Sequence, residues 1–349
     1  MTIDEVFQFL VKAGSAAPSA DNMQPCFFAR EGDDLVLRYR AMGGERALFD
    51  SGHPATLIAM GAVVENLSQA CTHLGLLEAM QTGQAGITSG EFCRIRLREA
   101  PAGQAAVLPL FARHTNRFGY RKTRLPVSLK ESISSQSQGD ASVRWIESSA
   151  VIGEIGKLVE RASRVRFQTR EIHDWFSNSL RFTREQVLSG DGLDVATFDL
   201  PPGGKLLLKA ITARWSNMAL FNAVGGYRFL ASLEASSINK AGAVLAILAP
   251  GTAQGGLDAG RVMERIWIAL NAAGCGVQPY YVVSDQIIRL ERDRVPLAHR
   301  DAISALKAGL QTAIPDRGVG TVHMFLRVGE PLKCATLARR LPIAARSIG

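Results

Sequence analysis

Amide and hydroxyl side chains gather in the stretch PSADNMQP, which follows a helical pattern and precedes an apolar run. Ser19, Asn22 and Gln24 offer hydrogen-bond donors and acceptors there, and Pro18 and Pro25 restrict the backbone around them. A turn that stabilises itself would use the same residue types. The alternative is a stiff loop that presents hydrogen bonds to the edge of a flat heterocycle and has few states to order on binding.

Two further stretches are rich in arginine: RHTNRFGYRKTR in the middle of the chain and LARRLPIAAR near its C-terminus. The chain has a formal net charge of +8, which is typical either of nucleic-acid binding or of a pocket for an anionic ligand. The other basic residues are spread along the sequence, and neither stretch lies in a known nucleic-acid-binding motif. We therefore expect no nucleic-acid partner. Each stretch is either a binding site for a small anion or a solvated basic surface.

The composition is that of a globular protein, because 47% of the 349 residues are hydrophobic and 21% are charged. This length fits two ordinary domains or one domain built from two similar halves. No apolar run reaches the roughly 18–20 residues that cross a bilayer, and the N-terminus has acidic residues where a signal peptide has basic ones. The five cysteines show no CxxC spacing, and the six histidines show no HxxxH or HExxH pattern. We expect a cytoplasmic protein with reduced thiols, no membrane partner and no metal site.

Helical and strand patterns alternate along the first third of the chain. Apolar residues recur with helical spacing over Thr2–Ala13 and over Pro54–Met80, where Gly75 marks the expected end of the second helix. FFAR and DLVLRYR are typical of strands joined by the turn EGDD, and FCRIRLRE predicts another strand. The segment APAGQAAVLP has the composition of a linker.

The rest of the chain combines regular elements with one long loop. SGDGLDVATFDLPPGG (Ser189–Gly204) is rich in glycine and proline and exceeds ordinary connections in length, so it is a lid or a mobile insert. Helical spacing predicts helices over about 127–135 and 151–176, and a buried helix in LDAGRVMERIWIALNAAGCG that ends at Gly274. AGAVLAILAP is almost wholly apolar, which is typical of a central strand. VRWIES, VQPYYVV and TVHMFLRVGEP predict further strands.

Two apolar helical stretches match one another at a constant offset of 199 residues. GAVVENLSQACTHLG begins at Gly61, GRVMERIWIALNAAG begins at Gly260, and they share five identical residues in fifteen, including both terminal glycines. Two buried helices can share small and apolar residues by chance; the alternative is an internal duplication. Equivalent helices packed about a pseudo-twofold axis would let one chain imitate a symmetric dimer. PSADNMQP occurs only in the first half and RHTNR only in the second, so we expect one complete site between the halves, with its twin lost.

These stretches resemble motifs of the flavin-dependent nitroreductase family, whose members are usually homodimers that bind FMN at the subunit interface. In that family an Arg-x-Ser/Thr-x-Arg/Lys element, here RHTNR, holds the FMN phosphate. A Pro-Ser-x-x-Asn-x-Gln-Pro loop, here PSADNMQP, contacts the isoalloxazine ring from the partner subunit. A helix ending in glycine and a proline turn, here GCGVQPYYV, approach flavin N5, and an arginine before Leu-Pro, here RRLP, completes the phosphate site. The resemblance covers most of the chain, and DGLDVATFDLP is similar to the lid of single-chain, duplicated members.

The resemblance implies a role for each candidate residue. Arg113, Thr115 and Arg340 are expected at the FMN phosphate, with Arg339 as the alternative to Arg340, because a guanidinium makes paired charge-assisted bonds. Arg117 is expected near N1 and O2 of the ring, where a cation favours the reduced anion. His114 is expected to contribute through its backbone or by packing. Asn22, Ser19 and Gln24 are expected at the pyrimidine edge, in a loop that Pro18 stiffens. Gln278 and Pro279 are expected beside the ring, and the backbone N–H groups of Tyr281 and Val282 near N5. A typical relative carries an acidic residue where Tyr281 aligns, so the family's ordinary handling of substrate does not carry over to this position. Tyr280 or Tyr281 would instead stack over the flavin or fill the core.

The implied fold is α+β, a duplicated nitroreductase-like unit with mixed or antiparallel sheets around central helices. Residues 1–106 would form the first half and residues 107–349 the second, with a lid insertion at about 184–205. The implied function is that of an FMN-dependent oxidoreductase that transfers hydride through flavin N5, with NAD(P)H as electron donor and a nitro compound, a quinone or another metabolite as small-molecule substrate. A flavin-storing protein without turnover and a biosynthetic tailoring dehydrogenase are the alternatives. We expect one FMN per chain, in a monomer that imitates a dimer or in a homodimer.

Overall fold

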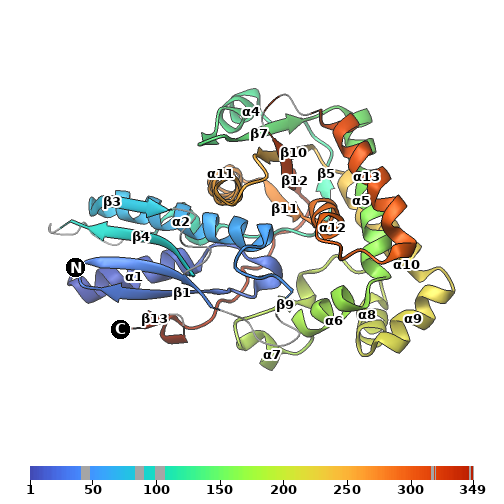
Figure 1. Cartoon of the computed structure of the whole chain (residues 1–349), viewed down its shortest axis with the longest axis horizontal. Helices are drawn as coiled ribbons and strands as arrows, with labels where there is room; N and C mark the ends of the chain where they lie inside the picture. Colours follow the sequence, from blue (N-terminus) through green and yellow to red (C-terminus); the bar gives the residue numbers. More distant parts are fainter. Residues whose placement is uncertain are drawn as a thin grey trace.

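The fold combines helices with two mostly antiparallel sheets, which confirms the expected α+β class (Figure 1). The structure is a computed structural model that describes residues 1–40, 48–82, 90–98, 107–315, 318, 320–345 and 347–348. The expected boundary between the halves at residue 106, and most of the expected linker APAGQAAVLP, lie outside the described residues.

The first sheet has the strand order β13-β1-β2-β4-β3. Its strands are β1 (Cys26–Glu31), β2 (Asp34–Tyr39), β3 (Leu77–Thr82), β4 (Glu91–Leu97) and β13 (Ser347–Ile348). β1 and β2 form a hairpin, as expected for FFAR and DLVLRYR around the turn EGDD. β13 pairs with β1 in parallel, so the C-terminal end of the chain returns to the sheet that the N-terminal segment builds. Figure 1 accordingly shows both termini beside this sheet.

The second sheet has the order β11-β12-β10-β7-β6, with the short β5 paired to β12. Its strands are β5 (Tyr120–Arg121), β6 (Ser137–Gln138), β7 (Ala141–Ile146), β10 (Ala243–Ala249), β11 (Gly276–Tyr280) and β12 (Thr321–Pro331). Every residue of β10 is buried between β12 and β7, which confirms the central strand expected from its apolar run. A strand covered on both faces needs no alternation of polar and apolar residues.

Two long helices, α2 (Pro54–Leu74) and α11 (Ala253–Ala272), pack against one another between the sheets. A single apolar core contains residues of both helices, of both sheets and of α1 (Ile3–Ser15). The helical pattern over Pro54–Met80 was expected to end near Gly75, and α2 does end there: Gly75 adopts a left-handed conformation with φ +70°, and the chain then enters β3. The expected helix ending near Gly274 is confirmed as α11.

The helix expected over 151–176 is wrong as a single element. The chain forms α5 (Ser149–Phe167) and α6 (Arg170–Ser179), with Gln168 and the extended Thr169 between them. At the end of α5 the carbonyl of Val165 accepts hydrogen bonds from the Thr169 hydroxyl (2.9 Å) and from the backbone N–H of Gln168 (3.0 Å). Apolar spacing continues across this break, because α5 and α6 each have an apolar face. Periodicity alone therefore could not detect the change of direction between the two helices.

Several elements were not predicted from the sequence. After Gly203 the chain forms α8 (Gly204–Thr212), α9 (Trp215–Ala223) and α10 (Gly226–Asn239), and after the second sheet's β11 it forms α12 (Val282–Glu291) and α13 (Arg300–Ala313). A second core joins α5, α10, α12 and α13 to the face of the second sheet away from α11. The remaining elements are α4 (Val127–Ser134), α7 (Arg184–Leu188), β8 (Leu180–Arg181), β9 (Leu193–Asp194) and the short 3₁₀ segments η1 (Ala20–Asn22), η3 (Pro109–Ala112), η4 (Val195–Thr197), η5 (Leu297–His299) and η6 (Ile343–Ala345).

Within the described residues, none of the helices combines the length and the apolar character needed to cross a bilayer. The same part of the chain contains no cluster of three or more His, Cys, Asp or Glu side chains placed to hold a metal ion.

Candidate functional site

A cavity of about 820 Å³ lies between the PSADNMQP loop, the start of α2, α11, the β11–α12 junction and the helices from α5 to α10. Pockets for drug-sized ligands and cofactors have volumes of roughly 300–1,000 Å³. All predicted site residues except Gln24 line it: Pro18, Ser19, Asn22, Arg113, His114, Thr115, Arg117, Gln278, Pro279, Tyr281, Val282 and Arg340. A second cavity of about 570 Å³ near Leu129 and Gly274 shares none of them. Tertiary structure therefore brings together groups that lie more than 300 positions apart in the sequence.

The PSADNMQP loop is held in an unusual conformation. Asp21, Asn22 and Gln24 have positive φ angles of 46°, 59° and 52°, which side chains other than glycine rarely adopt. The backbone N–H of Gln24 donates to the Ser19 hydroxyl (2.9 Å), so part of the loop's polarity stabilises its own turn, as one of the two sequence-based interpretations required. The other side chains make bonds to distant segments, and these bonds compensate the strain.

Asn22 connects three segments of the chain. Its Nδ2 donates to the carbonyls of Gly192 (3.1 Å) and Arg339 (3.0 Å), and more weakly to that of Gly190 (3.4 Å), while its Oδ1 accepts from Arg340. We expected this amide to bind the pyrimidine edge of a ligand. Its observed partners all belong to the protein, so ligand binding by this side chain stays a prediction that would require exchange of these bonds.

Gln24 lies behind the cavity wall rather than in it. Its side chain is 3% exposed, donates to the carbonyls of Asn22 (3.1 Å) and Gly190 (2.8 Å), and accepts from the backbone N–H of Leu341 (3.1 Å). Gln24 thus acts on the site by joining the N-terminal loop to the segments around residues 190 and 340.

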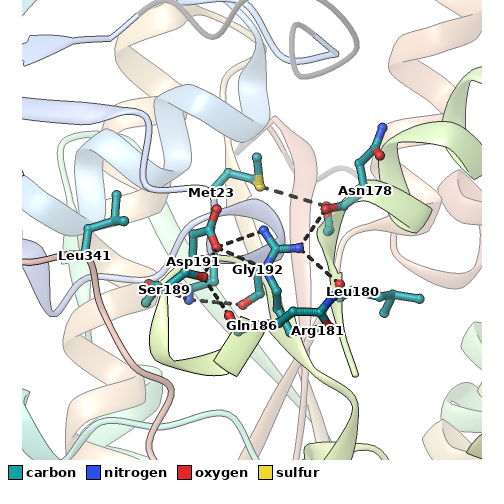
Figure 2. A network of polar contacts seen from close by, with 12 residues as sticks. Met23, Asn178, Leu180, Arg181, Gln186, Ser189, Asp191, Gly192 and Leu341 are labelled. Carbon is teal, nitrogen blue, oxygen red and sulfur yellow. Dashed lines mark hydrogen bonds and ion pairs between the residues drawn. The ribbon is translucent and has the colours of Figure 1, made fainter. Parts of the chain in front are cut away.

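The segment expected as a lid is ordered and covers one side of the cavity. It is not a plain loop, because it contains β9 and η4 and pairs with β8. Figure 2 shows the contacts that hold it: Arg181 donates through Nε (3.0 Å) and Nη2 (2.8 Å) to Asp191, which also accepts from Ser189 (2.8 Å). Gly190 has φ +83°, and a Cβ there would lie 2.4 Å from the carbonyl oxygen of Arg340. The lid therefore packs directly against the C-terminal segment.

Two guanidinium groups meet at one end of the cavity. Arg113 Nη2 and Arg340 Nη2 both donate to the carbonyl of Ala16, at 2.9 and 3.0 Å. Arg113 also stacks on the ring of Trp267, with 4.7 Å from its guanidinium carbon to the ring centroid. Its Nε lies 3.0 Å from Oε1 of Glu264, at ion-pair distance without the alignment of a hydrogen bond.

Glu264 is the counter-charge behind these arginines. It comes from α11 and is fully buried. Burial raises the pKa of its carboxyl to about 7, and the positive charges of Arg113 and Arg340 oppose that rise. Sequence analysis did not single out Glu264 for the site, although it is one of the identities between the two matching helices. Glu264 can act as a counter-charge only because it meets Arg113, which lies 151 positions earlier in the chain, and no local sequence pattern reveals that contact.

The RHTNR segment is anchored mainly by its backbone. The N–H of His114 donates to Oδ1 of Asn271 (2.8 Å), and the His114 carbonyl accepts from Nε1 of Trp267 (2.9 Å). Arg117 donates to the Thr197 hydroxyl of the lid (3.3 Å). Burial lowers the pKa of Arg117, and the negative charge of Asp21 opposes that effect.

Asp21 and Trp175 form a pair that the sequence did not indicate. Trp175 Nε1 donates to Oδ2 of Asp21 (2.8 Å), and both residues line the cavity. Burial raises the pKa of the Asp21 carboxyl, whereas this hydrogen bond lowers it. Asp21 lies in the PSADNMQP loop, so the sequence could have indicated this carboxyl group as a site residue. Nothing in the sequence indicated its partner Trp175 on α6.

The β11–α12 junction presents a helix N-terminus to the cavity. Tyr281 is the N-cap residue of α12 and supplies no side-chain cap, and Val282 is the first helical residue. The first N–H groups of a helix have no helical partners and carry partial positive charge. The side-chain oxygen Oε1 of Gln278 is buried without a hydrogen-bond partner among the described residues. These groups can bind a ligand with a polar edge and developing negative charge.

Comparison with known proteins gives a likeness in structure only. No family model matches the sequence, and no curated protein matches it. A nitroreductase with bound FMN from Bacteroides fragilis is similar at 11% identity and TM-score 0.35, covering 67% of this chain and 92% of that one. An iodotyrosine deiodinase bound to FMN and 3-iodo-L-tyrosine is similar at 13% identity and TM-score 0.37, with 67% and 94% covered. The FMN-dependent nitroreductase NfnB from Mycobacterium smegmatis, in complex with NADPH, is similar at 13% identity and TM-score 0.37, with 68% and 94% covered. Likeness at this level assigns neither activity nor ligand to the present chain.

Proposed function

We propose that this protein is an FMN-dependent oxidoreductase of the nitroreductase type that binds one FMN in the cavity of about 820 Å³. The observation that carries the proposal is the assembly of the cavity. Four separate stretches resembling FMN-binding motifs, PSADNMQP, RHTNR, GCGVQPYYV and RRLP, all contribute residues to its wall.

The arginine end of the cavity fits a phosphate group. Arg113 and Arg340 both donate to the carbonyl of Ala16, and Arg340 also donates to Oδ1 of Asn22, so two cations converge beside the buried carboxyl group of Glu264. Phosphate oxygens are acceptors that guanidinium groups bind through paired, charge-assisted hydrogen bonds. Thr115 lines the same cavity and adds a hydroxyl donor.

The opposite end of the site fits a flavin ring. Gln278 and Pro279 lie in β11 and line the cavity, and the uncapped N-terminus of α12 follows directly. Arg117 is a half-buried cation close enough to interact with Asp21. A cation and a helix N-terminus stabilise negative charge on a reduced ring, which is the electronic role that a protein has in flavin chemistry.

A bound flavin would supply two-electron hydride chemistry, with NAD(P)H as donor and a nitro compound, a quinone or another metabolite as substrate. The chain's own residues bind and orient the cofactor. Arg113 and Arg340 fix its anionic end, and the lid around Asp191 excludes water from one side of the cavity.

A flavin-storing protein is the second candidate function. It is favoured by the closed lid, because Asn22 and Gln24 bond to the carbonyls of Gly192 and Gly190 in the lid. Storage requires retention of the ligand, whereas turnover requires that the cavity opens to substrate.

The test is flavin binding followed by anaerobic reduction. The purified chain should be yellow or should become so on addition of FMN, and Arg113→Ala and Arg340→Ala should each weaken binding. Arg121→Ala is the matched control, because Arg121 is a solvent-exposed arginine paired with Glu330. Bleaching by NADPH supports the oxidoreductase, and bound flavin that resists every nicotinamide and chemical two-electron donor supports storage. A chain that neither retains nor rebinds FMN contradicts both functions.

A further inference from the structure

Asp285 is a buried carboxylate that the proposed FMN contacts do not use. It lies in the first turn of α12, lines the cavity, and is 8% exposed. Its Oδ2 accepts from Nε2 of Gln286 (3.3 Å), whereas its Oδ1 has no hydrogen-bond partner among the described residues. A buried carboxylate oxygen without a partner is costly, so the position calls for a ligand that supplies one.

The cations nearest to Asp285 are already paired with other carboxylates. Arg289 donates to Glu171 (2.6 Å), and Arg166 donates to Glu234. Both arginines act on Asp285 by charge, and Glu171 opposes them. Asp285 is therefore left without an ion-pair partner of its own within the described residues.

The neighbouring polar groups are acceptors or uncharged. The buried oxygen of Gln278 lacks a donor in the described part of the chain, as Oδ1 of Asp285 does, and both residues line the cavity. Tyr281 stands one helical turn before Asp285, and its hydroxyl is also buried without a hydrogen-bond partner among the described residues. Burial raises the pKa of this hydroxyl well above the ordinary value, so it stays neutral and supplies no counter-charge to Asp285. Two orphan acceptors require a ligand that donates hydrogen bonds.

Apolar and aromatic side chains line the same cavity as Asp285, and we call the part that they line the aromatic compartment. Phe49 and Trp175 pack edge to face, with ring centroids 5.0 Å apart, and both line the cavity. Other apolar side chains from α5, α6, α8 and α9 complete it: Phe167, Ile172, Leu208, Ile211 and Met218. Aromatic faces attract cations as well as flat apolar bodies.

We propose that Asp285 anchors the protonated amine of a ligand whose flat apolar body lies in this aromatic compartment. The ammonium group would donate to Oδ1 of Asp285, and the Gln278 oxygen would accept a further hydrogen bond. The further statement that this ligand is the substrate rests on the oxidoreductase function proposed above. The presence of an amine-binding subsite does not depend on that function.

The test is calorimetric titration of the full chain, before and after addition of FMN, with phenethylamine, 2-phenylethanol and 3-phenylpropionate. We expect the amine to bind more tightly than the alcohol and the acid. Asp285→Asn should weaken amine binding roughly tenfold or more, as loss of one member of a buried charge pair does, and should leave alcohol binding unchanged. Asp258→Asn is the matched control, because Asp258 is a buried carboxylate of α11 that bonds to Gln254 (3.1 Å) and does not line the cavity.

The pH dependence gives an independent readout. Burial raises the pKa of Asp285 to about 6, and the charges of Arg289 and Arg166 oppose that rise. Amine binding should therefore weaken as the pH falls through about 6, since phenethylamine keeps its charge over that range. Should Asp285→Asn fail to fold, Asp285→Ser removes the same charge with a smaller side chain.

Three results would overturn the subsite: equal binding of amine and alcohol, an unchanged amine affinity in Asp285→Asn, or amine binding that tightens on acidification. The last would mean that Asp285 acts as a protonated donor. Selective amine binding by a chain that never binds FMN would contradict the oxidoreductase while supporting the subsite, so the two failures are distinguishable.

Discussion

Gly61 and Gly260 pack against one another's helices in a reciprocal manner where α2 crosses α11. A Cβ on Gly61 would lie 2.0 Å from the carbonyl oxygen of Leu257, and a Cβ on Gly260 would lie 2.1 Å from that of Ile58. Leu257 and Ile58 are themselves related by the offset of 199 residues that relates the two glycines. The two contacts at the crossing are therefore reciprocal, and they allow backbone-to-backbone contact at the centre of the fold, while the internal duplication stays a prediction.

Gly61→Ala and Gly260→Ala are each expected to lower the free energy of unfolding by about 3 kcal/mol or more. Overpacking usually costs about 1–3 kcal/mol, and here the obstacle is backbone rather than a mobile side chain. Gly153→Ala in α5 is the control, because a Cβ there meets nothing within 4 Å; it should stabilise by about 0.4–1 kcal/mol. Urea unfolding measures all three. A loss under 1 kcal/mol for both central glycines would contradict the described helix crossing.

The same offset relates Glu65 to Glu264, but their surroundings differ. Glu65 accepts hydrogen bonds from Arg265 (2.8 Å from both Nε and Nη2). The residue of α2 that corresponds to Arg265 is Asn66, whose amide donates to the carbonyl of Ala13 (3.1 Å) and also lowers the pKa of Glu264 by hydrogen bonding, but carries no charge. Glu264 thus lacks the equivalent arginine and pairs with Arg113. On one side of the helix crossing, Glu65 of α2 pairs with Arg265 of α11. On the other side, Glu264 pairs with Arg113, which lines the cavity.

This asymmetry predicts opposite pH dependences for the two carboxylates. Folding raises the pKa of Glu264 to about 7 from an ordinary 4.5, so its contribution to stability is complete below about pH 4.5 and is lost as the pH rises through about 7. The stability of Glu264→Gln relative to the wild type should therefore improve by roughly 2–3 kcal/mol between pH 5 and 8.

Glu65→Gln is the matched control for that experiment. Burial opposes ionisation of Glu65, but hydrogen bonds from Arg265 and Gln69 lower its pKa overall. Its contribution is present above the unfolded pKa and is lost only at lower pH, so the difference from the wild type should be flat from pH 5 to 8. Urea unfolding across that range gives both curves. A flat curve for Glu264→Gln would show that its carboxyl ionises normally in the folded chain.

Asn22→Gly should loosen the lid. Glycine accepts the positive φ of this position without strain, so the substitution removes the side-chain bonds to Gly192, Arg339 and Arg340 and the weaker bond to Gly190 without straining the backbone. With about 1 kcal/mol for each bond, amide exchange of lid residues should accelerate by about tenfold or more. Asn217→Ala in α9 is the control. It removes a single exposed hydrogen bond to the carbonyl of Ala210 in α8, so amide exchange of the lid should stay unchanged. Equal exchange in Asn22→Gly would mean that other contacts close the lid.

Arg117→Met should make the bound flavin harder to reduce. This half-buried cation would stabilise negative charge on the reduced ring, so its removal should lower the midpoint potential of the FMN-loaded protein by about 30 mV or more. Arg121→Met is the control, since this arginine is exposed and bonds to Glu330 outside the cavity. Potentiometric titration measures the difference. An unchanged potential would remove Arg117 from the flavin site.

Local sequence patterns identified the strands and the long buried helices because burial imposes a period on them. β10 is apolar at every position and lies at the centre of its sheet, and α11 ends where Gly274 predicted. The same reasoning failed where burial does not follow the chain. α8, α9 and α10 have many exposed positions and were missed, and the break between α5 and α6 at Thr169 leaves apolar spacing intact.

For the candidate site, the sequence determined the residue types that a phosphate and a flat polar ring require, and it placed them in PSADNMQP, RHTNR, GCGVQPYYV and RRLP. Only the tertiary structure decided that these stretches line one cavity, that Asn22 and Gln24 bond to the lid, and that Glu264 lies behind Arg113. It also placed Asp285 in the wall without an ion-pair partner among the described residues. The physical reason is that local periodicity reports whether a residue is buried, whereas hydrogen-bond and charge partners are set by segments that meet only when the chain has folded.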